Sequence, residues 1–554
     1  MDRSIFSYPI MKHYERRVAY FSMEFALDQA LKIYSGGLGF LAGSHLRSAY
    51  ELGQSLIGIG ILWKYGYYDQ GRDVDTTMKP SFVEKNYSYL VDDQIVFTVN
   101  IHESPVHVKA LFLKPETFGS APLYLLTTDI PENDFLSRSI THRLYDSNEA
   151  TRVAQSIILG AGGAKLLDIL DYQPEVYHMN EGHALPLTFY LYNKFKSLHE
   201  VRQRVVFTTH TPEAAGNEEH SYHLLEKMSF FQGIREPEVK HLLGMEGHSL
   251  NYTLAALKFA RKANGVSRLH AQVSQRMWAG HKDICEIQAI TNSQNRTYWA
   301  DRQLRESIES DQKDRILQRK MELKRELFKV VADQTGKLFK EDTLTIVWAR
   351  RFAAYKRADL LMRDWSRFTR LINNPRYPVQ VIWAGKPYPE DQRAIGLFND
   401  IINRAKPLSN CAVLVGYELS LSALLKKGSD VWLNNPVLYR EASGTSGMTA
   451  AMNGSVNVSI PDGWIPEFAR DKENCFVIPP APDQASHEEK DHLEAANLYD
   501  ILENQVLPIY YDHPDQWLQI VRNAFQDIYP AFDSSRMVDQ YYSQLYDPVT
   551  VPVY

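Results

Sequence analysis

An alternation of short apolar runs with amphipathic stretches, repeated in two halves of the chain, constrains the fold most strongly. Strand-like runs in the first half occupy 17–25, 55–62, 94–101, 123–129, 175–180 and 204–211. A helix is expected over 147–170, capped by Ser147. A polar helical stretch precedes a second alternation over 343–434, with one helix starting near Ala358. This pattern predicts an α/β protein with two doubly wound parallel sheets facing a ligand cleft.

Size and composition exclude several classes of protein. A chain of 554 residues is too long for one hydrophobic core, so two or three domains are expected. Its 61 basic and 67 acidic residues give a net charge of −6, which argues against a nucleic-acid surface. We find no membrane-length apolar run, no secretory signal over 1–17, and no metal-type spacing among the three cysteines. We therefore expect a cytoplasmic protein without nucleic-acid or membrane partners.

Three stretches contain residue types suited to binding an anion. The glycines of YSGGLGFLAG (34–43) precede a helical run, where free backbone N–H groups attract negative charge. ARRFAAYKR (349–357) places four cations directly after an apolar strand. EASGTSGM (441–448) follows another strand and begins a helix at Gly444 and Thr445. Each has an ordinary structural explanation alone, but three together indicate a shared phosphate site.

Polar residues also follow three strand-like runs, in NEGH (180–183), TTHTP (208–212) and TNSQN (291–295). His183 and His210 lack the spacing of a metal site, so no metal is expected. Glu181 and Glu441 could serve as the carboxylate pair of a glycosidase, but nothing in the sequence shows that they lie within reach of each other.

Ordered motifs between about residues 18 and 464 resemble the α-glucan (glycogen, starch and maltodextrin) phosphorylases, specifically the short bacterial and archaeal branch. They are VAYFSMEFAL, IYSGGLGFLAG, HMNEGHA, VFTTHTPEAAGN, NGVSRLH, ITN, RRFAAYKR, WAGK, DVWLNNP, EASGTSGM, NG and DGW. The resemblance implies a GT-B fold, with two Rossmann-like domains around a deep cleft. We expect an N-terminal domain over 1–293, a C-terminal domain over 294–515, and a helical segment over 516–554 that packs back on the first domain.

The resemblance also implies retaining phosphorolysis of α-1,4-glucan to glucose 1-phosphate, with pyridoxal 5′-phosphate contributing its phosphate to catalysis. Carried over by position, the catalytic residues are His210, Arg351 and Lys356. Residues expected to contact or lie near phosphate are Gly37, Leu38, Arg350, Arg351, Lys356, Gly444 and Thr445. Residues expected to contact sugar are His210, Asn292, Glu441, Ala442, Ser443 and Gly444. Tyr65 and Trp299 match aromatic residues near the cofactor.

One position departs from the family in its chemistry. Thr449 stands where the family has the lysine that forms a Schiff base with pyridoxal phosphate. Threonine has no amine, so it cannot make that bond. GSHLR (43–47) likewise replaces the GDHLK of the short branch, and the next lysine along the chain is Lys472. We expect pyridoxal phosphate to be bound non-covalently or not at all.

Three functions remain open from the sequence. The first is an active phosphorylase whose cofactor is held without a covalent link, acting on an α-glucan or other oligosaccharide with phosphate or glucose 1-phosphate. The second is a retaining GT-B glycosyltransferase that uses a nucleotide sugar. The third is an inactive glucan-binding homologue, which the retained cations and the SGT turn disfavour. Whether the protein forms a homodimer stays open.

Overall fold

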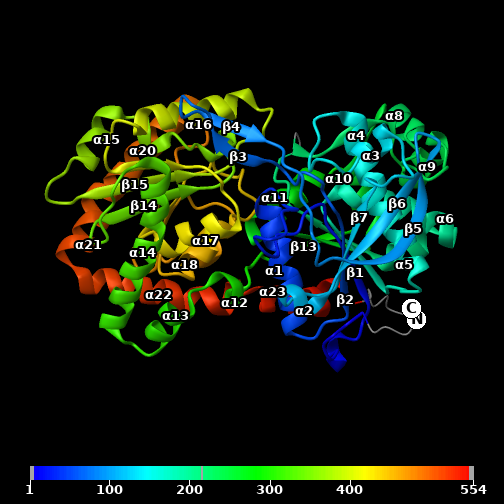
Figure 1. Ribbon diagram of the computed structural model, residues 1–554, viewed down its shortest axis with the longest axis horizontal. Helices are drawn as coiled ribbons and strands as arrows, with labels where there is room; N and C mark the ends of the chain where they lie inside the picture. Colours follow the sequence, from blue (N-terminus) through cyan, green and yellow to red (C-terminus); the bar gives the residue numbers. More distant parts are fainter. Residues whose placement is uncertain (1–4, 214–215, 548–554) are drawn as a thin grey trace. The chain divides into compact units, whose positions relative to one another are not determined.

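The computed structural model describes residues 5–213 and 216–547, which belong to two compact units. Unit 1 comprises Met1–Tyr68, Phe82–Asn292 and Ser534–Tyr554, and unit 2 comprises Asp69–Ser81 and Ser293–Asp533. Each unit has a central sheet with helices on its faces (Figure 1). Across the described residues, no helix is both long and apolar enough to cross a membrane.

Unit 1 contains a nine-stranded mixed sheet. In spatial order its strands are β13 (Glu286–Ala289), β12 (Lys262–Gly265), β9 (Val205–Thr209), β8 (Val176–Asn180), β1 (Val18–Phe21), β2 (Leu56–Ile61), β7 (Leu123–Thr127), β6 (Ser104–Leu113) and β5 (Val91–Ile101). The strands from β13 to β7 are parallel, whereas β6 and β5 join antiparallel at one edge. The continuous burial of β1, β2, β7, β8 and β9 explains their uninterrupted apolar sequences.

Apart from α23, the helices of unit 1 lie between its strands in the sequence. They are α1 (Gly37–Glu51), α2 (Pro115–Phe118), α3 (Phe135–Ser139), α4 (Glu149–Ile157), α5 (Gly163–Ile169), α6 (Pro186–Phe195), α7 (Leu198–Arg204), α8 (Tyr222–Lys227), α9 (Glu236–Leu243), α10 (Tyr252–Phe259), α11 (Arg268–Trp278) and α23 (Ser534–Gln540). The helix expected over 147–170 consists of α4, a π-helical turn and α5. Its predicted cap was wrong by one residue, because the side chain of Asn148 accepts the hydrogen bond from the N–H of Thr151. A short hairpin pairs β10 (Glu219–Ser221) with β11 (Ser249–Asn251).

Unit 2 is built on a six-stranded sheet in which every neighbouring pair is parallel. The strand order is β16 (Cys411–Leu414), β15 (Val379–Ala384), β14 (Leu344–Ala349), β17 (Val431–Asn434), β18 (Val456–Ser459) and β19 (Phe476–Val477). This is the order of a doubly wound α/β fold, in which the winding reverses between β14 and β17. Ligands of such sheets bind at the carboxyl ends of the strands beside that reversal.

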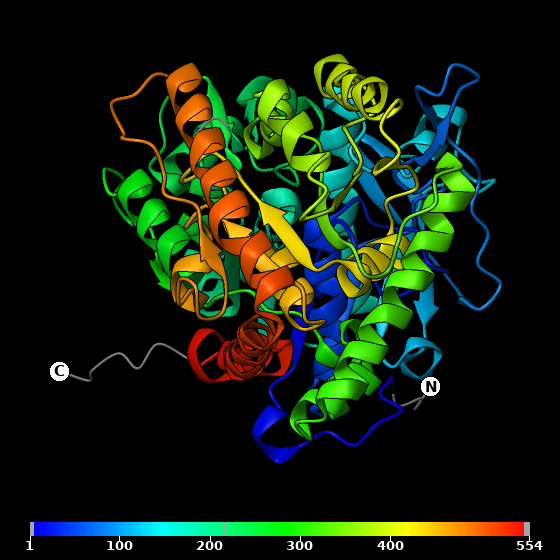
Figure 2. The ribbon, with the colours of Figure 1, turned by 90° about the vertical axis from the view of Figure 1, so that its left-hand side faces the viewer.

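Helices cover the sheet of unit 2 and complete its core. They are α12 (Arg296–Trp299), α13 (Arg302–Glu309), α14 (Lys313–Thr335), α15 (Trp365–Ile372), α16 (Gln392–Ala405), α17 (Leu419–Gly428), α18 (Thr445–Ala451), α19 (Ile465–Phe468), α20 (His487–Ile501), α21 (Leu507–Asp512) and α22 (Pro514–Phe532). In Figure 2 the orange and red helices α20, α21 and α22 pass beside this sheet, and their apolar residues share its core. The helix expected from about Ala358 begins later, at Trp365, because two short 3₁₀ turns occupy the residues after β14.

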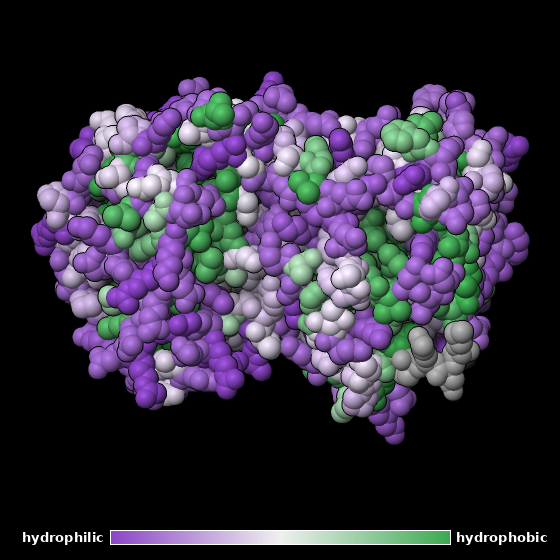
Figure 3. All heavy atoms as spheres, viewed as in Figure 1, coloured by the Kyte–Doolittle hydropathy of each residue, from purple (hydrophilic) through white to green (hydrophobic). Residues whose placement is uncertain are grey.

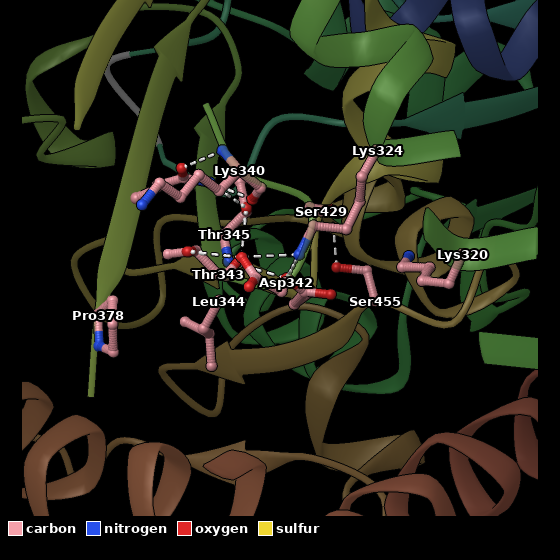
Figure 4. A network of polar contacts seen from close by, with 12 residues as sticks. Lys320, Lys324, Lys340, Asp342, Thr343, Leu344, Thr345, Pro378, Ser429 and Ser455 are labelled. Atoms are coloured by element: carbon pink, nitrogen blue, oxygen red, sulfur yellow. Dashed lines mark hydrogen bonds and ion pairs between the residues drawn. The ribbon is translucent and has the colours of Figure 1, made fainter. Parts of the chain in front are cut away.

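A buried ion pair fixes α14 to the amino-terminal edge of this sheet. The ammonium of Lys324 lies 2.5 Å from Asp430 Oδ2 and donates to the carbonyl of Thr343 at 2.7 Å. The same carboxylate oxygen accepts the N–H of Thr345 at 2.8 Å, so it joins the starts of β14 and β17. Figure 4 shows Lys324 next to Thr343 and Thr345. The pair lies at the edge of the sheet opposite the strand ends that would hold a ligand.

Two segments belong to a different unit from the one expected. The hairpin of β3 (Asp69–Arg72) and β4 (Met78–Ser81), expected in the first domain, packs in unit 2, where Gln70 Nε2 donates to the carbonyl of Gly385 at 2.8 Å. The segment expected to return to the first domain from 516 does so only from Ser534. Helix α22 stays in unit 2 because its apolar face packs into that core. Helix α23 instead joins α1 in unit 1 through a hydrogen bond of 2.6 Å between the hydroxyls of Ser534 and Ser48.

The outer surface is mainly hydrophilic on the face drawn in Figure 3, with hydrophobic atoms showing between charged side chains. The largest apolar side chains are instead buried, among them Trp63 in unit 1 and Trp348, Trp383 and Trp432 in unit 2. The two sheets therefore account for the long apolar runs of the sequence.

Candidate active site

The reversal point of unit 2 brings together two loops that the sequence identified separately. One loop follows β14 and contains Arg350 to Arg357, and the other follows β17 and leads through Glu441 to α18. The N–H of Val437 donates to the carbonyl of Tyr355 at 2.8 Å, which ties the loops to each other. Because β14 and β17 are parallel neighbours, the carboxyl ends of both strands lie at the same edge of the sheet.

Two of the predicted cations converge on Glu441. Lys356 Nζ forms an ion pair with Glu441 Oε2, and Arg350 Nη1 lies 3.5 Å from the same oxygen. Arg350 also donates to the side chain of Asn434 at the end of β17. Burial would raise the pKa of Glu441, but Lys356 and Arg350 hold it below its ordinary value. Glu441 is therefore an ionised acceptor, and the sequence had not shown that it pairs with these cations.

The other two arginines of the loop differ in their surroundings. Arg351 is exposed and lowers the pKa of Glu441 through its charge, so it lies within electrostatic reach of that carboxylate. Arg357 is buried and bonds to Asp491 at 2.9 Å and Glu494 at 2.6 Å. It also donates to the carbonyl of Asn435 at 2.9 Å. Arg357 thus holds the loop after β17 against α20, which is a structural role.

Asp462 organises the backbone of the Glu441 loop, and sequence reasoning missed it although it lies in the DGW motif. Its Oδ2 accepts the N–H groups of Arg440 at 3.1 Å and Glu441 at 3.0 Å, and its Oδ1 accepts that of Gly463 at 2.8 Å. Gly463 has a φ of 58°, and a Cβ there would meet the carbonyl oxygen of Ser443 at 2.2 Å. Only glycine therefore lets these two loops approach so closely.

Burial raises the pKa of Asp462 to about 7, so this carboxyl gives a testable pH dependence. A group whose pKa is higher in the folded state binds more protons there, and its stabilising effect is lost as the pH rises. Relative to Asp462→Asn, wild-type protein should lose unfolding free energy between about pH 4 and pH 7. Urea denaturation of both proteins across this range measures the difference. A constant difference would show that Asp462 does not titrate in this way.

Four residues expected to contact sugar or phosphate, Ala442 to Thr445, form the turn that leads into α18. Gly444 adopts a left-handed conformation with a φ of 87° directly before α18, which begins at Thr445. Ala442 and Ser443 are buried, and the carbonyl of Ser443 accepts the N–H of Trp464 at 2.9 Å. Within the described residues, the buried Ser443 Oγ and Arg350 Nε have no hydrogen-bond partner. Such atoms are costly when unpaired, so these two are candidate contacts for a polar ligand.

Thr449 is fully buried on α18, and its hydroxyl bonds within its own helix. Thr449 Oγ1 donates to the carbonyl of Ser446 at 3.0 Å. The side-chain amide of Asn453 donates to the carbonyls of Thr449 at 2.8 Å and Trp299 at 2.9 Å. The indole of Trp299 is buried, and Lys426 Nζ lies 3.8 Å from its ring centroid. Thr449 and the expected cofactor-side tryptophan are thus neighbours, and a lysine from α17 lies on that tryptophan.

Replacing Thr449 with alanine tests whether its hydroxyl has any function. The hydroxyl donates to backbone carbonyls of the preceding turn, and alanine is a better helix former. Thr449→Ala should therefore change the unfolding free energy by less than about 1 kcal/mol. Chemical denaturation measures the unfolding free energy. Native mass spectrometry shows whether the variant retains the same ligands as wild-type protein. A loss of retained ligand would instead assign the hydroxyl a binding role.

In unit 1, His210 lies directly after β9 within a polar network at the strand ends. His210 Nε2 lies 2.7 Å from Asn180 Oδ1, and the amide of Asn180 donates to the hydroxyl of Ser22 at 3.1 Å. The backbone N–H of His210 donates to Glu181, whose φ of 72° is strained for a residue other than glycine. Burial lowers the pKa of His210 to about 3, so its imidazole is neutral near pH 7. A neutral imidazole can exchange hydrogen bonds with sugar hydroxyls.

Gly37 and Leu38, which were expected near phosphate, lie in the first turn of α1. Gly37 begins α1, and the preceding N–H groups of Ser35 and Gly36 donate to the carboxylate of Glu24 at 2.6 and 3.2 Å. Glu24 also accepts the hydroxyl of Tyr145 at 2.7 Å, a contact that sequence reasoning missed. Leu38 follows in the first turn of α1.

Asn292 and Tyr65 are held by backbone hydrogen bonds. The N–H of Asn292 donates to the carbonyl of Val266 at 2.9 Å, and that of Tyr65 donates to the carbonyl of His142 at 2.9 Å. Within the described residues, the buried Asn292 Oδ1 has no hydrogen-bond partner. This oxygen is thus a candidate acceptor for a ligand hydroxyl. Over the same described ranges, no cluster of three or more His, Cys, Asp or Glu could hold a metal ion.

Comparison with known proteins identifies the family. The model of the carbohydrate phosphorylase family matches residues 242–543. The chain is 32% identical to maltodextrin phosphorylase of Thermococcus litoralis, covering 96% of this chain and 71% of the relative. It is 30% identical to glycogen phosphorylase of Aquifex aeolicus, covering 97% and 87% of the two chains. An uncharacterized protein of Methanocaldococcus jannaschii is 46% identical over 95% and 99% of the two chains.

The chain belongs to the carbohydrate phosphorylase family, as its motifs predicted. Its mixed α/β architecture with parallel sheets is consistent with that membership. Family membership does not by itself define the reaction of a chain that has threonine at position 449.

Proposed function

We propose that the protein is a retaining α-glucosyl transferase of the phosphorylase type, which interconverts α-1,4-glucan plus phosphate with glucose 1-phosphate. We propose with it the GT-B fold of two Rossmann-like domains around a deep cleft. The observation that carries the proposal is the buried Glu441, ionised between Lys356 and Arg350 at the reversal point of unit 2. An inactive glucan binder would not need this arrangement of charge.

The proposed chemistry assigns each of these groups a role. Arg351 and Lys356 would bind substrate phosphate, together with the turn at Gly444 and Thr445, because fixed cations and N–H groups stabilise charge that develops in the transition state. Glu441 would accept hydrogen bonds from the glucosyl unit. Its pairing with two cations makes it a poor nucleophile, which argues against a carboxylate-pair glycosidase mechanism.

Unit 1 would supply the remaining contacts in this proposal. His210 and Asn292 would bind sugar at the bond that is cleaved, and Gly37 and Leu38 would lie near the reacting phosphate. The neutral imidazole of His210 suits this role because it can donate one hydrogen bond and accept another. Tyr65 and Trp299 would border the cofactor region.

A pyridoxal phosphate bound in this site would supply its phosphate group to the reaction. Arg350 would then bind the cofactor phosphate through its buried guanidinium, which donates charge-assisted hydrogen bonds. No link through Thr449 is part of this proposal, because that side chain has no amine and its hydroxyl bonds to backbone.

A second candidate is a retaining transferase whose nucleotide-sugar donor supplies the second phosphate. The specific observation in its favour is the loss of the amine at Thr449 while the cations after β14 remain. Incubation of the protein with maltoheptaose and inorganic phosphate tests the first candidate. Glucose 1-phosphate of the α configuration should appear by nuclear magnetic resonance.

Parallel reactions with uridine and adenosine diphosphate glucose test the second candidate. Chain extension from either nucleotide sugar, without phosphorolysis, would replace the first proposal with the second. No turnover in any reaction would favour a glucan-binding role. The absorbance spectrum and native mass of the purified protein would show which ligand it retains.

A further inference from the structure

A buried lysine lies on the ring of Trp299 in unit 2 and has no role in the proposed reaction so far. Lys426 is on α17 with 1% of its surface exposed, and its Nζ lies 3.8 Å from the ring centroid of Trp299. A cation is attracted to the face of an indole at this distance. Burial nevertheless lowers the pKa of Lys426 well below its ordinary value. A lowered pKa favours the neutral form of an amine, which is the form that attacks a carbonyl carbon.

Hydrogen bonds link the ends of α17 and α18, the helices that contain Lys426 and Thr449. Asn453 links α18 to Trp299, because its amide donates to the carbonyls of both Thr449 and Trp299. Lys320 Nζ then donates to the carbonyls of Asn453 and Lys427, both at 2.9 Å. The end of α17 and the end of α18 are therefore tied to the same ammonium, and the two helices pack against each other.

The residues present fit an aromatic aldehyde such as pyridoxal phosphate if the attaching amine comes from α17. Thr449 on α18 offers no amine, but Trp299, which the family resemblance places near the cofactor, has the amine of Lys426 on its face. A lysine side chain is long and flexible, so its amine can approach an aldehyde that lies near the indole. The sequence singled out only Lys472 by number as a possible substitute, because the contact between Lys426 and Trp299 depends on tertiary packing.

We propose that Lys426 is the carbonyl-reactive amine of this site and replaces, from α17, the lysine that the family has at position 449. The proposal rests on the proposed cofactor region. In the reaction Lys426 Nζ adds to the aldehyde carbon, and a carbon–nitrogen double bond forms. The aldehyde oxygen leaves as water with the two protons of the amine, so no oxidant or reductant is required. This covalent attachment departs from the expectation from the sequence, which was non-covalent binding or no binding.

Borohydride trapping with pyridoxal 5′-phosphate tests the proposal on the full-length protein. Borohydride reduces the double bond to a stable secondary amine, and peptide mapping by mass spectrometry then locates the label. We expect a label on Lys426 in wild-type protein. Lys426→Met should lose it, and so should Lys426→Arg, which keeps a long polar side chain against Trp299 but has no primary amine. Lys427→Met is the matched control on the same helix and should keep the label.

Pyridoxamine 5′-phosphate, which has no aldehyde, should leave no label. A wild-type protein without label on Lys426, or a label that remains in the same peptide of Lys426→Arg, would overturn the proposal. The outcome is separable from the proposed function. Phosphorolysis without a label would sink this inference alone, whereas a label on Lys426 in a protein that does not phosphorolyse glucan would sink the proposed reaction alone.

Discussion

Replacing Arg351 with alanine should lower kcat/KM for glucan phosphorolysis by about 2–4 kcal/mol of transition-state stabilisation, or roughly 30- to 1000-fold. Arg351 follows β14 at the reversal point of unit 2 and acts electrostatically on Glu441. Its guanidinium is exposed, so its loss should leave the fold intact. Initial rates of glucose 1-phosphate release at varied phosphate concentration measure the effect.

Arg376→Ala is a matched control for the loss of one positive charge. Arg376 is exposed on unit 2 and pairs with Asp512 at 3.0 Å, away from the loops after β14 and β17. Its removal should leave kcat/KM unchanged, because exposed ion pairs contribute little. If Arg351→Ala turned over as fast as this control, Arg351 would have no part in the mechanism.

Asp430→Asn should lower the unfolding free energy by about 3–5 kcal/mol, because it leaves the buried Lys324 without its countercharge. The side chains of Lys324 and Asp430 are only 2% and 5% exposed, and water cannot replace the lost partner. Asparagine keeps an oxygen that can accept the N–H of Thr345, so the change isolates the charge. Urea denaturation followed by circular dichroism measures the loss.

Asp515→Asn provides the comparison, because Asp515 pairs with Lys313 at an exposed position. This exposed pair is screened by solvent, so its loss should barely alter stability. A similar small change for Asp430→Asn would mean that Lys324 loses its charge or reaches solvent when its partner is neutral.

Local chemistry could be predicted from the sequence because it depends on neighbouring residues. Continuous apolar runs indicated buried parallel strands such as β14 and β17, since both faces of those strands are covered. The order of the motifs indicated the family, which the comparisons confirmed. The absence of an amine at Thr449 is likewise a property of one residue. The sequence alone therefore excludes a Schiff base at position 449.

Tertiary structure decided which distant residues became neighbours. Arg350, Lys356 and Glu441 form one charged cluster because β14 and β17 are adjacent in the sheet, although β15 and β16 lie between them in the chain. Lys426 of α17 likewise lies on Trp299 of α12, although the two residues lie far apart in the sequence. The placement of α22 in unit 2 depended on where its apolar face found a core. Periodicity shows that a face is apolar, but only packing determines what covers it.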